Sequence, residues 1–155
     1  MPWFDRKHPP HHPLIRHHNR SPIVFVTVCS RGRKPIFAGH DVAELFVRAW
    51  RDASAWQVGR YVIMPDHVHL FCSPATYPLM PLGRWVAFWK SSMTRHWPSA
   101  DEKPIFQRDF WDTQLRSADH YSAKWEYVRH NPVRAGLVRS VGEWPYQGEL
   151  EMLRE

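Results

Sequence analysis

Two histidines two residues apart, His67 and His69, have a spacing that suits metal chemistry. On a strand, positions i and i+2 point to the same face, so both imidazoles could bind one divalent ion while Val68 packs in the core. The apolar run that follows indicates a largely buried strand, in which polar side chains need a partner. Two surface histidines at a strand end remain the alternative, and the spacing alone does not decide.

A tyrosine and an asparagine four residues apart, Tyr127 and Asn131, form the second candidate group. On a helix this spacing places both side chains on one face. A tyrosine hydroxyl beside a phosphate can act as a nucleophile, and an amide oxygen is a suitable ligand for Mg²⁺ or Mn²⁺. A core aromatic and a helix C-cap are the alternative, which the spacing alone favours.

Basic residues dominate the charge of the chain. Of its 155 residues, 21 are Lys or Arg and 15 are Asp or Glu, a formal charge of +6. This balance favours a polyanionic partner, and several cations adjoin aromatic residues that can stack on bases. The candidate nucleic-acid contacts are Arg31, Arg33, Lys34, Lys90, Arg95, Arg129 and Arg134. For any one of them, a solvated surface charge is the alternative.

Several protein classes are disfavoured by what the sequence lacks. It contains no P-loop, no dinucleotide-binding glycine pattern, no G-x-S-x-G and no H-E-x-x-H. It also has no 18-residue apolar stretch and no secretory signal pattern, so no membrane association is expected. Cys29 and Cys72 lie in apolar runs and are interpreted as reduced core residues of a cytoplasmic protein.

The hydrophobic pattern predicts strands alternating with helices. Residues 22–29 are β-branched and aromatic, which is typical of a buried strand, and apolar residues three and four apart after a cap at Asp41 indicate a helix. The expected elements are a strand at 22–29, a helix from Asp41 to about Trp56, a hairpin of 58–64 and 67–73, a helix at 82–97, extended structure at 106–116, a helix from about Asp119 to His130 or Asn131, and a short extended or irregular segment from Val138.

This order, β-α-β-β-α-β and then a helix, predicts an α+β fold of the ferredoxin-like split βαβ type. We expect an antiparallel sheet with helices on one face, plus a C-terminal helix that carries Tyr127. Residues 1–21 are rich in His, Pro and Arg and are expected to form a flexible basic arm. Residues 22–147 would form the catalytic domain and residues 148–155 a tail.

Two long motifs resemble a known family. The segment from Trp56 to Leu70, which contains M-P-D-H-V-H-L, is similar to the HUH segment of single-tyrosine transposases. The segment Y-V-R-H-N-P-V-R-A-G-L-V, from Tyr127 to Val138, resembles the tyrosine segment of their REP-associated branch, as does Trp144-Pro145-Tyr146. The similarity spans roughly residues 22–147. Asp66 departs from the pattern, because Asn is commoner there.

The resemblance to REP-associated tyrosine transposases implies both a site and an activity. It implies that His67, His69 and Asn131 hold Mg²⁺ or Mn²⁺ and that Tyr127 is the catalytic tyrosine. The implied enzyme nicks and joins single-stranded DNA at REP-like hairpins through a 5′-phosphotyrosine. It would act near the bacterial nucleoid, as a monomer or homodimer. Asp66 is a candidate for the base that accepts the tyrosine proton.

Two other classes of function stay open. A domesticated relative could bind a DNA or RNA hairpin without cutting it, using the same basic and aromatic residues. A metal-dependent phosphodiesterase could use water in place of Tyr127 and would leave free ends with no protein–DNA link.

Overall fold

A five-stranded antiparallel sheet forms the centre of the fold. The computed structural model describes residue 11, residue 14 and residues 21–154. The strands are β1 (Ile23–Cys29), β2 (Trp56–Ile63), β3 (His67–Pro74), β4 (Trp111–Leu115) and β5 (Gln147–Glu149). Their order across the sheet is β4-β1-β3-β2-β5, so β1 and β3 lie at its centre. Most of the arm expected at residues 1–21 lies outside the described residues.

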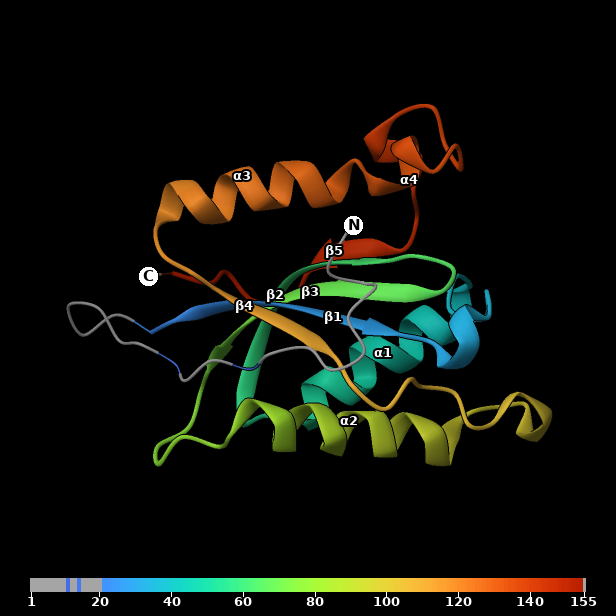
Figure 1. Ribbon diagram of the computed structural model, residues 1–155, viewed down its shortest axis with the longest axis horizontal. Coiled ribbons are helices and arrows are strands. Elements are labelled where there is room, and N and C mark those ends of the chain that lie inside the picture. The colour runs from blue at the N-terminus through green and yellow to red at the C-terminus, as the bar shows by residue number, and fades with distance from the viewer. Residues whose placement is uncertain (1–10, 12–13, 15–20, 155) are drawn as a thin grey trace.

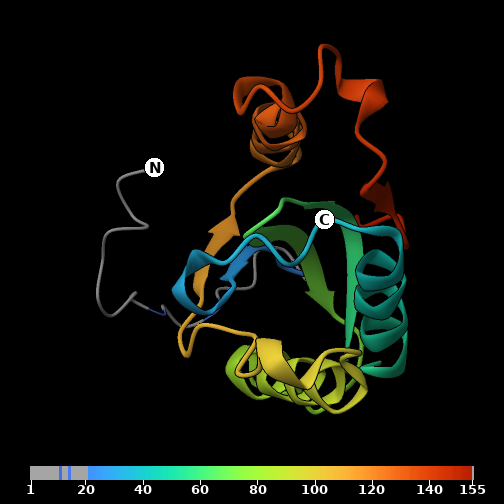
Figure 2. The same cartoon turned by 90° about the vertical axis from the view of Figure 1, so that its right-hand side faces the viewer.

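Helices cover both faces of this sheet. The helices α1 (His40–Asp52) and α2 (Leu82–His96) pack on one face, while α3 (Ala118–Arg129) runs across the other and leads into α4 (Asn131–Arg134). Figures 1 and 2 show the sheet between these two layers. Three short 3₁₀ helices, η2 (Arg31–Arg33), η3 (Ala100–Glu102) and η4 (Val141–Glu143), lie in the connections.

The two faces of β1 and β3 bury separate clusters. Val24, Val26 and Val28 point toward α1 and α2, whereas Phe25 and Phe71 point toward α3. This division follows from the two-residue period of a strand. All seven residues of β1 are buried, as expected for a central strand that is covered on both sides.

Tryptophans fill the core between the sheet, α1 and α2. Trp56, Trp85 and Trp89 are at most 1% exposed. The indole nitrogen of Trp56 donates to the Met80 carbonyl at 2.8 Å, and that of Trp85 donates to the Ala53 carbonyl at 2.7 Å. These rings therefore stabilise the fold and are not platforms for bases. Cys29 and Cys72 are buried free thiols, as the sequence predicts.

The helix α3 is attached to the sheet by aromatic rings and one arginine. The ring of Phe71 on β3 lies 4.9 Å from that of Tyr121 and 6.1 Å from that of Trp125. The guanidinium of Arg60 on β2 lies 5.3 Å from the Tyr121 ring centroid and 5.5 Å from that of Trp125. Arg60 also forms an ion pair with Glu149 of β5 at 3.4 Å. These contacts fix which face of α3 meets the sheet.

The expected α+β, ferredoxin-like fold is confirmed, but several boundaries differ. The first helix ends at Asp52, not near Trp56, because Trp56 begins β2 and pairs with Pro74. Gly39, not Asp41, is its N-cap. In the expected extended segment at 106–116, only Trp111–Leu115 is a strand, and Phe106 forms an isolated bridge with Ser30.

The C-terminal segment contributes to the sheet. The strand β5 crosses the boundary expected at residue 147 and pairs with β2. Leu153 is buried, and its side chain lies against Gly59, where an added Cβ would stand 2.7 Å from it. A side chain at position 59 would therefore displace this segment. Among the described residues, no helix combines the length and apolarity that a membrane crossing requires.

We predict that Phe71→Ala costs about 3–5 kcal/mol of unfolding free energy, because it leaves a cavity under α3. The exposed Phe88, at 54%, provides the matched control, and Phe88→Ala should change stability by about 0.5 kcal/mol or less. Urea unfolding of both variants measures the difference. Equal losses in the two variants would contradict the packing of α3 against Phe71.

Candidate active site

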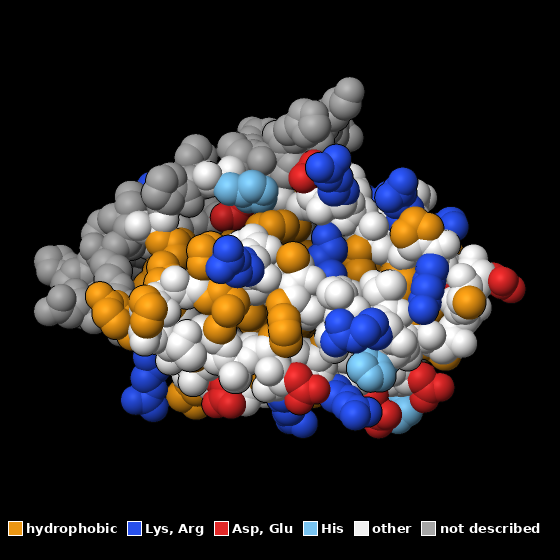
Figure 3. Space-filling model, turned by 90° about the horizontal axis from the view of Figure 1, so that it is seen from below, with side chains coloured by type: hydrophobic (Ala, Val, Ile, Leu, Met, Phe, Trp, Pro, Cys, Tyr) orange, Lys and Arg blue, Asp and Glu red, His pale blue; other side chains and the backbone are white. Residues whose placement is uncertain are grey.

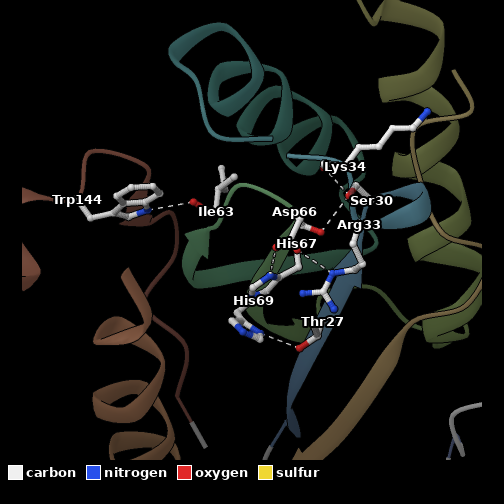
Figure 4. Close-up of polar contacts among 9 residues, drawn as sticks. All are labelled: Thr27, Ser30, Arg33, Lys34, Ile63, Asp66, His67, His69 and Trp144. Atoms are coloured by element: carbon white, nitrogen blue, oxygen red, sulfur yellow. Dashed lines mark hydrogen bonds and ion pairs between the residues drawn. The ribbon is translucent and has the colours of Figure 1, made fainter. Parts of the chain in front are cut away.

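The two histidines of the predicted metal pair lie at the start of β3, on the face that α3 covers. His67 is 9% exposed and His69 is fully buried. Their ring centroids are 4.7 Å apart and the rings are nearly perpendicular, at 74°. Figure 4 shows both side chains on the same side of the strand. We call these two residues the histidine pair.

Each imidazole of the histidine pair is oriented through its Nδ1 atom. A hydrogen bond of 2.7 Å joins His69 Nδ1 to the hydroxyl of Thr27, its register partner on β1. His67 Nδ1 donates to Asp66 Oδ1 at 2.8 Å. With the proton on Nδ1, the lone pair of each neutral ring is on Nε2, the atom that would coordinate a cation. Two neighbouring residues thus determine which nitrogen each ring presents.

Asp66 is bonded through both carboxylate oxygens. Its Oδ2 accepts a hydrogen bond from Arg33 Nε at 2.9 Å, while Oδ1 is bonded to His67. Burial alone would raise the pKa of Asp66, but the hydrogen bonds and charges of His67 and Arg33 outweigh it and lower the pKa from 3.8 to about 2. A carboxylate this acidic does not accept a proton near neutral pH. Asp66 therefore orients His67 and is unsuited to act as a base for Tyr127.

His69 is held in its neutral form. Burial lowers its pKa well below 6.5, and the nearby charges of His67, Lys124, Arg33 and Arg134 lower it further. A neutral imidazole keeps the lone pair that a metal ligand needs. The charge contributions also show that cations from η2, α3 and α4 all lie close enough to act on this ring.

Tyr127 lies on α3 with 48% of its surface exposed. The guanidinium of Arg134 lies 3.9 Å from the centroid of its ring. The same arginine donates to the Tyr127 carbonyl at 2.6 Å and to Asn131 Oδ1. Arg134 therefore connects the predicted nucleophile with the predicted third ligand.

Tyr127 and Asn131 do not share one continuous helix. The helix α3 ends at Arg129, His130 links the two helices, and Asn131 begins α4. Pro132 explains the break, because a proline disfavours helical geometry in the residue before it. The two residues are nevertheless brought together through their common contact with Arg134.

Lys124 and Phe25 connect α3 with the histidine pair. The ammonium of Lys124 lies 6.0 Å from the Tyr127 ring centroid and 4.8 Å from that of Phe25. The Phe25 ring stacks on His69 with a centroid distance of 5.2 Å. Lys124 is not among the site residues predicted from the sequence, although its spacing of three residues from Tyr127 predicts the same helical face.

The predicted nucleic-acid contacts fall into two groups. Arg33 and Arg134 lie near the histidine pair, and Arg31 and Lys34 are exposed in the adjoining loop. Arg129, on α3, bonds to Glu126 at 3.0 Å. Lys90 and Arg95 belong to α2, on the opposite face of the sheet.

Lys90 is engaged in packing. Its ammonium donates to the carbonyls of Gln107 at 2.8 Å and Arg108 at 3.3 Å, and burial lowers its pKa to about 8. Arg95 is exposed and contacts Ser91. Figure 3 shows that the molecular face seen from below also carries scattered basic side chains among hydrophobic ones. The structure thus separates Lys90 and Arg95 from the histidine pair.

The metal ligands predicted from the sequence are His67, His69 and Asn131. Within the described part of the chain, no group of three or more His, Cys, Asp or Glu residues could hold an ion. Two imidazole nitrogens and an amide oxygen are acceptable ligands for a divalent cation of intermediate hardness. Three protein ligands leave further coordination positions for water or phosphate. In the structure, the Asn131 oxygen is bonded by Arg134, so coordination would require this contact to change.

Known proteins resemble the chain in sequence. No family model matches it. A Haemophilus influenzae protein assigned to the REP-associated tyrosine transposases is 29% identical over 99 residues, or 54% of this chain and 53% of that protein. The Escherichia coli REP-associated tyrosine transposase is 25% identical over 93 residues, or 59% of this chain and 53% of that protein. The matches span about half the length of these curated relatives.

A solved structure agrees with the sequence matches. It is described as a REP-associated tyrosine transposase bound to a REP hairpin, and it covers 88% of this chain and 82% of its own with a TM-score of 0.68 at 23% identity. The chain is similar to the REP-associated tyrosine transposases. The resemblance identified from the motifs around His67 and Tyr127 is thereby confirmed. At 23% identity, the structural likeness by itself establishes the fold alone.

We predict that Asp66→Asn lowers the unfolding free energy at pH 7 by about 1–2 kcal/mol, after allowance for partial exposure. The folded-state pKa of about 2 lies below the usual 3.8, so this stabilisation is present above about pH 4 and disappears as the pH falls to about 2. Urea unfolding at about pH 7, 4 and 2.5 should show the difference between wild type and variant shrinking. Asp101→Asn, an exposed residue of η3, should show no such convergence.

Proposed function

We propose that this chain nicks and rejoins single-stranded DNA at hairpins, with Tyr127 as the nucleophile. The observation that carries the proposal is the position of α3 across the sheet face that holds the histidine pair. A half-exposed tyrosine is accessible to a nucleic acid, and the cations around it attract phosphate.

The proposed reaction is a transesterification. The Tyr127 hydroxyl oxygen forms a bond to phosphorus while the bond from phosphorus to the 3′ oxygen breaks. The tyrosine proton goes to solvent, and the 3′ oxygen leaves as a hydroxyl after taking a proton from water. A second 3′-hydroxyl then attacks the phosphotyrosine and releases Tyr127, so strands are exchanged without an energy source.

A divalent cation fits the proposed site. His67 and His69 would hold it through Nε2, and Asn131 through its amide oxygen. When bound, Mg²⁺ or Mn²⁺ supplies charge stabilisation to the attacked phosphate. Thr27 and Asp66 set the ring orientations, and the low pKa of His69 keeps that ligand deprotonated.

A DNA hairpin is the substrate form that the description of one similar structure supports. The solved relative is described with a REP hairpin bound to it. In this chain, Arg31, Lys34 and Arg33 form a basic loop directly beside Asp66 and His67. A loop of this kind can contact the backbone of a folded strand while a single-stranded flank reaches Tyr127.

We predict a covalent adduct between the protein and a hairpin oligonucleotide incubated with Mn²⁺. A label at the 3′ end should migrate with the protein on a denaturing gel, whereas a label at the 5′ end should remain on a free fragment. Tyr127→Phe should abolish the adduct, because it removes the attacking oxygen. Tyr77→Phe, at a tyrosine that is 85% exposed, is the control and should leave the yield unchanged.

The same gel separates the other two classes of function. Cleaved DNA with no adduct would indicate a phosphodiesterase that uses water. Intact DNA bound tightly without metal would indicate a hairpin-binding module. An adduct that persists in Tyr127→Phe would assign the nucleophile to another residue.

We predict that adduct formation requires the metal. A chelator should stop the reaction, and Mg²⁺ or Mn²⁺ should restore it. His67→Ala should lower the rate of adduct formation by roughly 100-fold or more, because it removes one of the proposed metal ligands. His40→Ala on α1, where the side chain is 82% exposed, should retain the wild-type rate. Full activity of His67→Ala would contradict the assigned ligand set.

A further inference from the structure

Lys124 occupies a position between the nucleophile and the histidine pair. Its ammonium lies 4.8 Å from the centroid of the Phe25 ring. The same ammonium lies 6.0 Å from the centroid of the Tyr127 ring. The spacing of three residues on α3 places both side chains on the same helical face. Phe25 itself stacks on His69. The cation thus lies where α3 and the sheet meet at the candidate site.

The charge around this position suits an anion. Three cations surround this position: Arg33 bonds to the Asp66 carboxylate that also bonds to His67, Lys124 lies over the Phe25 ring that stacks on His69, and Arg134 lies 3.9 Å from the Tyr127 ring centroid. The carboxylate of Asp66 is already bonded to Arg33 and His67. A phosphodiester carries one negative charge, which this surplus of positive charge would stabilise.

Arg134 has a different set of contacts from Lys124. Its guanidinium already donates to the Tyr127 carbonyl and to Asn131 Oδ1, and it lies 3.9 Å from the centroid of the Tyr127 ring. These contacts hold the junction between α3 and α4. Lys124 instead extends from α3 toward the sheet, with its ammonium over Phe25. Of the two cations beside Tyr127, Lys124 is the one that lies over Phe25, the ring that stacks on His69.

We propose that Lys124 binds the phosphate that Tyr127 attacks and stabilises its charge during the reaction. This inference rests on the proposed function and adds a catalytic residue to it. The ammonium donates to a non-bridging phosphate oxygen and keeps its proton throughout. The bond from the Tyr127 oxygen to phosphorus forms while the bond from phosphorus to the 3′ oxygen breaks. Throughout, Lys124 stabilises the negative charge on the non-bridging oxygens.

The test compares a charged and a neutral linkage at the cleavage position mapped with the wild type. Hairpin oligonucleotides labelled at the 3′ end carry there either the phosphodiester or a methylphosphonate, which lacks one anionic oxygen. Lys124→Met keeps an apolar stem over Phe25 and should slow adduct formation on the phosphodiester by roughly 100-fold. On the methylphosphonate, the rates of wild type and Lys124→Met should agree within about threefold, since the charge that Lys124 stabilises is gone.

Two further variants give the experiment its controls. Lys124→Arg keeps the positive charge and should react on the phosphodiester within about tenfold of the wild type. Lys103→Met removes an exposed lysine after η3 and should have no effect on either linkage. Thermal unfolding verifies that each variant is folded.

The outcomes separate the inference from the proposed function. If Lys124→Met loses the same factor on both linkages, or loses nothing on the phosphodiester, the role of Lys124 is overturned while the tyrosine chemistry stands. If the wild type forms no adduct with the phosphodiester and cleaves nothing, the proposed function itself fails, and this inference fails with it.

Discussion

The packing of α3 across β3 is the constraint on which the candidate site depends. His67 and His69 are fixed within the sheet, whereas Tyr127 belongs to a helix that reaches this face through side chains alone. Phe71, Arg60 and the rings of Tyr121 and Trp125 set that packing. A slip of α3 by one turn would move Tyr127 about 5.4 Å along the helix axis. Residues far from the chemistry therefore control the distance between nucleophile and histidine pair.

Positive charge dominates the surroundings of the histidine pair. Burial and neighbouring cations keep His69 neutral, so its lone pair is available to a metal. The same cations would repel a metal ion but attract a phosphate. The Asp66 carboxylate, which could offset this, is bonded to Arg33 and His67. Metal and phosphate would consequently stabilise each other in this site, because each supplies the charge that the other needs.

Much of the fold was predictable because β-branched runs and three-to-four spacing are local signals. The end of α1 was not, since Ala49, Trp50 and Ala53 continue a helical stripe toward Trp56, and only pairing with Pro74 starts a strand there. The paired imidazoles followed from strand periodicity. Lys124 was missed because spacing cannot tell which charged residue of a helix faces a sheet until the packing of that helix is known.

Position next to an aromatic residue did not predict which basic residues lie near the histidine pair. Lys90 follows Trp89 in the sequence, yet its ammonium bonds to two backbone carbonyls between α2 and the segment before β4. The accepting carbonyls belong to Gln107 and Arg108, 17 and 18 positions further along the chain. A local sequence pattern around Lys90 therefore cannot predict these hydrogen bonds.

Two tyrosines on α3 lie in contrasting environments. Tyr121 is 8% exposed and lies under Arg60 against Phe71, so its role is to hold α3 on the sheet. Tyr127 is 48% exposed, and both Lys124 and Arg134 lie near its ring. A ring that served only packing would have the first environment. A phenol that is half in solvent and near two cations contributes little to the core, and this environment suits the role of nucleophile proposed for Tyr127.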